Sequence, residues 1–162
     1  MTRKPQRLTH VAPDGSARMV DVSAKPATLR TARAEGVIRM SLEALEAIQT
    51  NKLAKGEVLS VARVAGIMAA KRTADLIPLC HPLTLEDVQV DLSPDIALPG
   101  VRAESHVRTT GRTGVEMEAI VAVTVALVTV YDMAKSVDRS MTIGDISLVE
   151  KTGGRSGTYF AR

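Results

Sequence analysis

The sequence predicts an α+β fold, in which helices cover one face of an antiparallel sheet, and three observations support this prediction. Two neighbouring segments alternate apolar and polar residues on either side of a turn, as antiparallel strands with one buried face do. Two longer stretches carry apolar residues on nearly every face of a helix. The chain has 162 residues, the size of one ordinary domain. We therefore expect a single domain over residues 1–162, with flexible ends at residues 1–16 and 152–162.

The first half of the chain predicts a strand and two helices. Residues 27–39 form a mixed run that we interpret as a strand, although alanine is frequent in it. Ser41 is a favourable N-cap for a short helix over residues 41–51, because apolar side chains recur there at helical spacing. Residues 56–77 are apolar on nearly every face, which predicts a second, largely buried helix that ends before Pro78.

The second half predicts two strands, a long helix and a closing strand. Residues 83–93 and 101–110 alternate in polarity around a turn rich in proline and glycine, as a pair of antiparallel strands does. Residues 115–137 then predict a long helix with glutamates in its first turn, where carboxylates suit the helix dipole. Residues 146–151 predict the last strand. The order β, α, α, β, β, α, β is the ferredoxin-like split βαβ sandwich with its first crossover enlarged.

Composition places the chain among globular proteins. Hydrophobic residues make up 45% and charged residues 24%, close to the soluble average. The uncharged stretch of residues 119–131 is too short for a typical membrane span and predicts a core helix instead. The basic start of the chain is not followed by the apolar segment of a secretory signal, and Cys80 is the single cysteine. These features predict a cytoplasmic protein with no contact to a membrane.

The charge favours a small anionic partner over a nucleic acid. The formal net charge is +3, which weakly favours an anion. The only aromatic residues are Tyr131, Tyr159 and Phe160, too few to stack RNA bases, and the basic residues are dispersed. A phosphorylated metabolite is therefore the expected class of ligand.

Asp132 and Lys135 stand three residues apart at the end of the predicted long helix. That spacing allows an ordinary helix ion pair, or a partly desolvated acid and base whose burial and mutual contact oppose each other. Glu118 lies fourteen residues earlier, about 21 Å along the axis and within about 40° of the same face. One small molecule reaches both carboxyls only if a second subunit or another segment closes that distance. Because the helix is apolar nearly all round, we expect oligomerisation.

Two further regions offer candidate groups. Cys80 and His81 follow Pro78, but adjacent residues of an extended chain point to opposite sides, so a buried structural cysteine and a ligand-contacting histidine are expected in place of a dyad. The three histidines and the cysteine show no metal-ligand spacing, so no metal site is predicted. Residues 150–157, EKTGGRSG, have the glycines and cations of a phosphate loop without its full spacing, and a loose tail explains them equally well.

Six segments, read in order, resemble the MoaC family of molybdenum cofactor biosynthesis. They are LTHV, ARMVDVSAK, KGEVLSVARVAGIMAAKRTADLIPLCHPL, GRTGVEMEA, TVYDMAK and EKTGGRSG, and they extend from residue 8 to residue 157. The resemblance implies a ferredoxin-like enzyme that assembles as a homohexamer, a trimer of dimers with sites at subunit interfaces. It also implies conversion of 3′,8-cyclo-7,8-dihydroguanosine 5′-triphosphate into cyclic pyranopterin monophosphate, with release of pyrophosphate and without a metal or organic cofactor.

The resemblance also assigns roles to individual residues by motif. Asp132 and Lys135 of YDMAK match an active-site aspartate and lysine, and Lys55 matches a further catalytic lysine. The positions that match substrate-binding or pocket-lining residues are Leu79, Cys80, His81, Met117, Glu118, Glu116, Lys71, Arg30 and Lys151. Without the resemblance, lysines such as Lys55 and Lys71 are most simply solvated surface groups.

Two positions depart from the usual family pattern, and two other functions stay open. Ala134 stands where YDMCK is common, and Arg155 where GGKSG is common; the arginine keeps the charge and adds a fork that binds phosphate with two hydrogen bonds. The first alternative is an oligomer that binds nucleotides without catalysis. The second is an RNA-binding ferredoxin-like domain, which the lack of aromatic residues disfavours.

Overall fold

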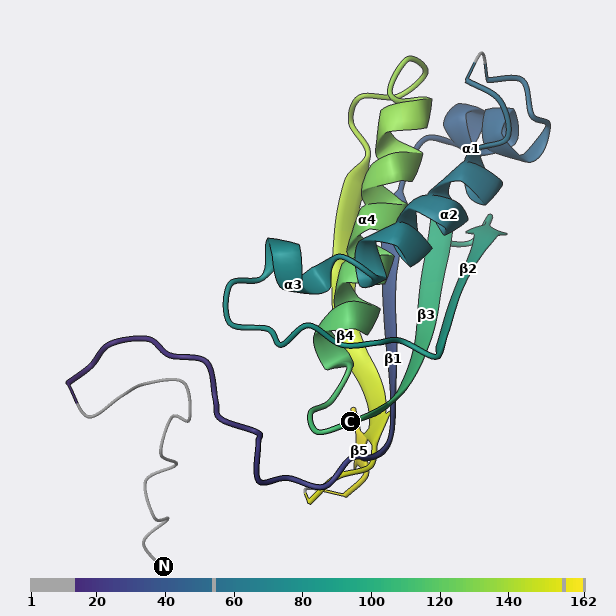
Figure 1. Cartoon of the computed structure of the whole chain (residues 1–162). Helices are drawn as coiled ribbons and strands as arrows, with labels where there is room; N and C mark the ends of the chain where they lie inside the picture. Colours follow the sequence, from purple (N-terminus) through teal and green to yellow (C-terminus); the bar gives the residue numbers. More distant parts are fainter. Residues whose placement is uncertain (1–13, 54, 156, 162) are drawn as a thin grey trace, which may run out of the picture.

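The computed structural model describes residues 14–53, 55–155 and 157–161, and its strands form a single sheet. The elements are β1 (Thr28–Arg39), α1 (Leu42–Gln49), α2 (Val58–Ala70), α3 (Thr73–Leu76), β2 (Asp87–Asp95), β3 (Gly100–Gly111), α4 (Glu116–Ala134), β4 (Thr142–Thr152) and β5 (Tyr159–Phe160). All neighbouring strands are antiparallel, in the order β2-β3-β1-β4-β5. The helices lie on one face of the sheet (Figure 1).

This topology confirms the predicted fold class. Strands β1 and β3 are central and β2 and β4 flank them, which is the strand order of a split βαβ unit. Helix α4 crosses from β3 to β4, while the enlarged first crossover contains α1, α2 and α3. The central strand β1 pairs with β3 along its whole length, from Thr28 opposite Gly111 to Arg39 opposite Gly100.

The core lies between the sheet and helix α4, and two glycines allow the elements to approach closely. A Cβ added at Gly36 of β1 would come within 2.9 Å of the side chains of Val123 and Ile146. A Cβ at Gly66 of α2 would lie 2.8 Å from the carbonyl oxygen of Ala122, so α2 and α4 pack backbone to backbone there. The buried Ser105 hydroxyl also donates a hydrogen bond of 2.8 Å to a carbonyl of α4.

Within the described part of the chain, α4 is the one helix whose length and apolar composition would allow it to cross a membrane. Its apolar residues are used inside the protein, since Ala119, Ala122, Val123, Leu127 and Val130 are fully buried. A core helix passes a test of length and composition as readily as a membrane span does. The burial therefore agrees with the prediction of a core helix.

The predicted second helix is divided into α2 and α3. The chain tightens after Ala70, where the Thr73 hydroxyl donates to the carbonyl of Ala70 at 3.0 Å and the amide of Arg72 bonds to the carbonyl of Ala69 at 3.0 Å. The backbone bond from Arg72 to Ala69 joins residues three apart in place of the regular helical spacing, and a turn separates α2 from α3 there. The helix expected over residues 56–77 is thus wrong as one continuous element.

Several strand and helix boundaries also differ from the sequence-based ones. Strand β2 begins at Asp87, four residues later than expected, because the chain before it is held by side chains, including the Thr109 hydroxyl that donates to the carbonyl of Thr84 at 2.7 Å. Strand β4 is longer than the segment predicted for it, and β5 was not predicted. Helix α4 ends at Ala134, three residues before the predicted end at residue 137.

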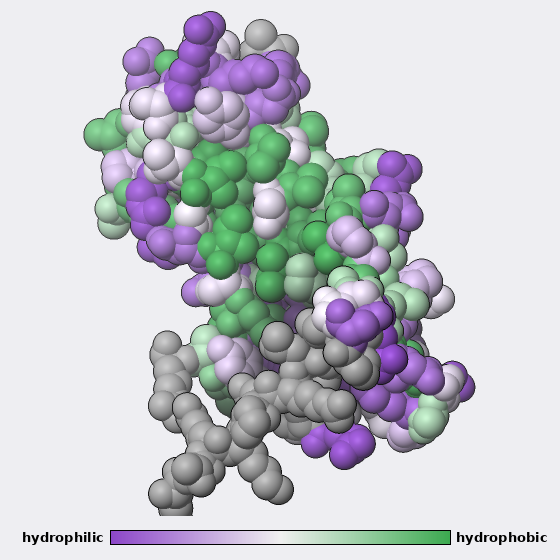
Figure 2. Space-filling view, turned by 90° about the vertical axis from the view of Figure 1, so that its left-hand side faces the viewer, coloured by the Kyte–Doolittle hydropathy of each residue, from purple (hydrophilic) through white to green (hydrophobic). Residues whose placement is uncertain are grey.

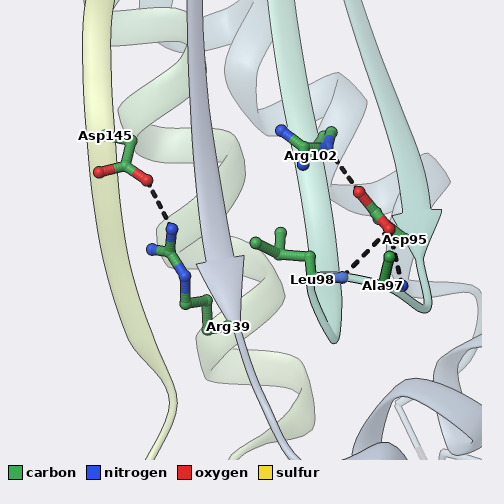
Figure 3. Close-up of polar contacts among 6 residues, drawn as sticks. All are labelled: Arg39, Asp95, Ala97, Leu98, Arg102 and Asp145. Carbon is green, nitrogen blue, oxygen red and sulfur yellow. Dashed lines mark hydrogen bonds and ion pairs between the residues drawn. The ribbon is translucent and has the colours of Figure 1, made fainter.

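Ion pairs and backbone hydrogen bonds organise the strand ends near the β2–β3 turn. Asp95 accepts hydrogen bonds from Arg102 Nε at 2.6 Å and from the amides of Ala97 and Leu98 (Figure 3). Across the sheet, Arg39 donates to Asp145 at 2.6 Å, and Asp145 takes a φ of 54°. These partly exposed charges stabilise the β2–β3 turn and connect β1 with β4. They do not converge on one point (Figure 3).

Candidate functional site

The end of α4 carries a cluster of three charged side chains. Asp132 accepts a hydrogen bond from Lys135 Nζ at 2.7 Å and another from Lys55 Nζ at 2.7 Å. Lys55 also donates to the backbone carbonyl of Asp132 at 2.9 Å, although it lies 77 residues earlier, in the loop before α2. The three side chains line a cavity of about 410 Å³ together with Ser136 and Arg139. The pair expected from the helical spacing is therefore part of a larger cationic site.

The two lysines keep the Asp132 carboxyl ionised. Its pKa is lowered to about 2, first by the hydrogen bond from Lys135 and then by the one from Lys55. The side chains of all three residues are about half exposed, so a ligand can reach them. In this state Asp132 accepts protons only weakly, and the ammonium groups are the available donors. A substrate that drew either lysine away would raise the basicity of Asp132.

The beginning of α4 borders a second cavity, of about 350 Å³, which three separate segments enclose. Its lining includes Leu79, Cys80, His81 and Leu83 from the loop before β2, Thr113, Gly114, Glu116, Met117 and Glu118 from the start of α4, and Val20, Val22 and Lys25 from the segment before β1. We call it the α4 N-terminal cavity. His81 Nε2 donates to the carbonyl of Val20 at 2.7 Å and so joins two of these segments. Six residues that the sequence singled out meet here.

Glu118 gives this cavity a group that titrates near neutrality. Its side chain is almost fully buried, and burial raises its pKa to about 7, with the nearby charge of Glu116 as a smaller cause. Burial also raises the pKa of the Cys80 thiol, and the Glu118 charge adds to that effect. The thiol therefore stays protonated, whereas Glu118 can both donate and accept a proton at neutral pH.

A third cavity, of about 470 Å³, lies where β1 begins. Lys25, Pro26, Thr28, Arg30, Gly154 and Arg155 line it. We call it the β1 cavity. Near it, Lys151 of β4 forms a half-buried ion pair of 2.6 Å with Glu116 of α4. Arg30, Lys151, Gly154 and Arg155 thus lie at the α4 N-terminal end of the molecule.

Not every candidate residue joins these cavities. Lys71 is exposed at the end of α2 and lines none of the three. Asp132 and Glu118 belong to the same helix and stay about 21 Å apart along it, so the two carboxyls lie in separate cavities of the chain. His10 and the LTHV segment lie outside the described residues. In the described part of the chain, no group of three or more His, Cys, Asp or Glu side chains is placed to hold a metal ion.

Sequence reasoning gave no role to Lys25, which lines both cavities at the α4 N-terminal end. It ends the ARMVDVSAK segment, which was noted for its resemblance alone. Most of the residues that line these cavities together with Lys25 come from distant parts of the chain. No spacing in the sequence therefore connects Lys25 to them. Its position becomes evident only from the folded structure.

The ferredoxin-like sandwich therefore defines a small α+β protein with two separate cavities that are lined by titratable groups, one at each end of α4. The comparison with known proteins is consistent with that class. The chain belongs to the MoaC family, whose profile matches residues 19–154. The resemblance noted in the sequence is confirmed.

Three curated relatives cover nearly the whole chain. A protein of a Methylobacterium species is 61% identical over 154 residues, which cover 95% of this chain and 96% of that protein. A protein of Parvibaculum lavamentivorans is 57% identical over 157 residues, covering 97% and 98%. A protein of Methylobacterium nodulans is 59% identical over 154 residues, covering 95% and 96%. All three are named cyclic pyranopterin monophosphate synthase.

Proposed function

We propose that this protein is a cyclic pyranopterin monophosphate synthase of molybdenum cofactor biosynthesis. Its substrate is 3′,8-cyclo-7,8-dihydroguanosine 5′-triphosphate, and its products are cyclic pyranopterin monophosphate and pyrophosphate. The observation that carries the proposal is the 57–61% identity to synthases of that name over nearly the full chain. The proposed location is the cytoplasm, which the single cysteine of the chain supports.

The reaction makes it a phosphorus–oxygen lyase. A hydroxyl oxygen of the substrate attacks the α-phosphorus, the bond from that phosphorus to the oxygen bridging to the β-phosphate breaks, and pyrophosphate leaves. The hydroxyl proton must pass to a base, and rebuilding the ring system requires further proton transfers. Asp132, Lys135 and Lys55 are the carriers at one half-site, where a carboxylate is held between two ammonium groups.

The α4 N-terminal cavity binds the ring system of the substrate. Glu118 is the polar group best suited to the edge of a guanine-like ring, because it is buried and titrates near neutrality. Leu79 and Met117 provide apolar surface beside it, and His81 closes the cavity against the segment before β1. The cavity thus has an apolar lining with a few placed polar groups, as small-molecule sites do.

The active site is completed by a second copy of the chain. A two-fold axis across the middle of α4 would place two such helices antiparallel, so that Glu118 of one copy approaches Asp132 of the other. Apolar side chains on the helices support such a contact, since Val128 is 50% exposed on α4 and Val64 is 55% exposed on α2. One face of the molecule also shows a broad hydrophobic area between hydrophilic ends (Figure 2). The proposed assembly is a homohexamer, a trimer of such dimers.

The main alternative is an oligomer that binds the nucleotide without catalysis. The Asp132 cluster counts against it, because a binder has no need for a carboxylate held by two lysines at an exposed site. An RNA-binding role is disfavoured by the scarcity of aromatic residues on the described surface.

Turnover of the substrate tests the proposal. Purified protein should convert the cyclised guanosine triphosphate into cyclic pyranopterin monophosphate and release one pyrophosphate per product. Asp132→Ala should bind the substrate without forming product, and its oligomeric mass should equal that of the unmodified protein. Binding without product by the unmodified protein would favour the non-catalytic alternative.

A further inference from the structure

Asp138 is a buried carboxylate that the proposed mechanism does not use. It is 8% exposed and lies between Ser136 and Arg139, which line the cavity of Asp132, without lining that cavity itself. Among the residues that the structure describes, no lysine, arginine or histidine nitrogen lies within 4.0 Å of its carboxyl oxygens. A buried charge is costly unless hydrogen bonds or an opposite charge compensate it, so the partners of Asp138 indicate what it does.

Three hydrogen bonds compensate the charge of Asp138. Its Oδ2 accepts from the amide of Ser41 at 2.8 Å, and its Oδ1 accepts from the amide of Ser140 at 2.8 Å and from the hydroxyl of Ser140 at 2.6 Å. The Ser140 hydroxyl, followed by the Ser41 amide, lowers the pKa of Asp138, so the carboxyl is ionised at neutral pH. Hydrogen bonds to an ionised acceptor are among the strong ones. The contact with Ser41 is therefore a firm connection.

Ser41 begins the part of the chain that leads to Lys55. It is the N-cap of α1, where the carboxylate of Asp138 also suits the helix dipole. After α1 the buried Leu53 anchors the chain in the core, two residues before Lys55. We call residues 41–55 the Lys55 stretch. Its first residue is bound to the turn after α4, at the same end of the molecule as the end of α4 (Figure 1).

Two contacts of different strength join the Lys55 stretch to the end of α4. One is the buried hydrogen bond from Ser41 to Asp138. The other is the ion pair of Lys55 with Asp132, whose side chains are 49% and 55% exposed. An exposed ion pair holds two segments together only weakly, because water screens it and both side chains lose rotamer freedom. The buried contact therefore keeps the two segments adjacent when the exposed pair opens.

We propose that Asp138 is a positioning residue that fastens the Lys55 stretch to the end of α4, so that Lys55 can exchange Asp132 for a substrate group without moving out of reach. A donor held near its working position loses little entropy when it engages the substrate. The effect on turnover rests on the proposed function, whereas the release of Lys55 from Asp132 can be measured without turnover.

A double-mutant cycle tests the effect on turnover. Asp138→Ala should lower kcat by about 10–100-fold, since a group that is misplaced by about 1 Å loses that much. The KM should change only a few-fold, because the α4 N-terminal cavity is untouched. In a Lys55→Ala background the same change should lower kcat by less than about twofold, because the lysine through which Asp138 acts is gone. A general loss of stability would lower kcat by the same factor in both backgrounds and would overturn the proposal.

The reactivity of the Lys55 amine tests the connection directly. In the unmodified protein its Nζ donates to the carboxylate and to the carbonyl of Asp132, which should slow acylation by an amine-reactive reagent. Asp138→Ala should raise the acylation rate of Lys55, measured by mass spectrometry, toward the rate in Asp132→Ala. The exposed Lys52 is the internal control and should react equally in all variants.

Ser41→Ala is the matched control variant. It removes the hydroxyl that accepts from the amide of Ala44 at 3.2 Å but keeps the backbone amide that donates to Asp138. Its kcat and its Lys55 acylation rate should therefore equal the parental values. Equal effects of Ser41→Ala and Asp138→Ala would reduce the role of Asp138 to the stability of α1 and contradict the proposal. If Asp138→Ala does not fold, Asp138→Asn, which keeps the shape and one acceptor oxygen, takes its place in every comparison.

The two measurements separate this inference from the proposed function. If the unmodified protein turns over and Asp138→Ala keeps kcat and Lys55 acylation within about twofold, the positioning role is wrong and the proposed function stands. If the unmodified protein makes no product but Asp138→Ala still frees Lys55, the connection stands and the proposed function fails.

Discussion

Glu118 and Asp132 lie on the same helix, about 21 Å apart along its axis, and occupy opposite electrostatic environments. Burial raises the pKa of Glu118 to about 7, whereas two lysines lower that of Asp132 to about 2. At neutral pH the first carboxyl is partly protonated and the second is ionised. Two carboxyls whose pKa values differ by this much can act one as an acid and the other as a base, provided that a substrate contacts both.

Asp132→Asn should lower kcat by about 10²–10⁴-fold, the usual range for a lost acid–base group. The amide keeps the shape of the side chain but no longer holds both lysines by charge. Because the side chain is about half exposed, the fold and the oligomer should be unaffected. Asp75→Asn, which removes an exposed carboxylate from α3, should leave kcat unchanged. Equal kcat values for the two variants would remove Asp132 from the mechanism.

Glu118 should make the stability of the protein depend on pH. The folded state holds the Glu118 proton up to about pH 7, whereas the unfolded chain releases it near pH 4.5. The unfolding free energy should therefore fall as the pH rises through this window and level off above it. Glu118→Gln, which is neutral throughout, should lack this contribution of roughly 3 kcal/mol. Urea unfolding at several pH values measures the difference, and identical slopes for the two proteins would contradict it.

A larger side chain at Gly66 should destabilise the protein, because α2 meets the backbone of α4 at this point. A Cβ there would lie 2.8 Å from the carbonyl oxygen of Ala122 and 3.2 Å from the side chain of Ala126. Gly66→Val should therefore lower the unfolding free energy by about 1–3 kcal/mol. At Gly144 the nearest atom is Arg39 Nη1 at 3.7 Å, so Gly144→Ala should change stability by less than about 1 kcal/mol. Chemical denaturation compares the two, and an undisturbed Gly66→Val protein would contradict the packing.

Val128→Glu should break the proposed assembly without unfolding the chain. The side chain is half exposed in the single chain, so a charge there costs little until a partner covers it. Leu42→Glu is the control, since Leu42 is 61% exposed on α1, which is not one of the helices proposed to meet. Light scattering should give a reduced mass for the first variant and the parental mass for the second. A parental mass for both would place the interface elsewhere.

The sequence predicts the regular elements well where one periodicity dominates. Strand β3 and helix α4 follow from alternation and from an unbroken apolar run, and Ser41 caps α1 as expected, with its hydroxyl accepting from the amide of Ala44 at 3.2 Å. Strand β5 has only two residues and shows no periodicity, so its pairing with β4 depends on tertiary structure. The break at Lys71 is hidden for a similar reason, since apolar residues continue on both sides of it.

The candidate site divides in the same way between local and long-range information. The Asp132–Lys135 contact follows from helical spacing, and the structure gives it a length of 2.7 Å. The third member, Lys55, is 77 residues away, and no local pattern connects the two positions. Lys25 joins two cavities for reasons that appear only after folding. The catalytic and binding roles taken from the family resemblance remain predictions.

Mixing two inactive variants tests most directly whether the active site is shared between chains. Asp132→Ala and Glu118→Gln damage opposite ends of α4, so a mixed dimer has one site with both changes and one intact site. After dissociation and reassembly of equal amounts, about one quarter of the parental turnover should return, since half of the dimers are mixed and half of their sites are intact. Asp132→Ala mixed with Lys135→Ala damages the same end and should recover nothing. A mixture of the Asp132 and Glu118 variants that exchanges subunits yet stays inactive would contradict the shared site.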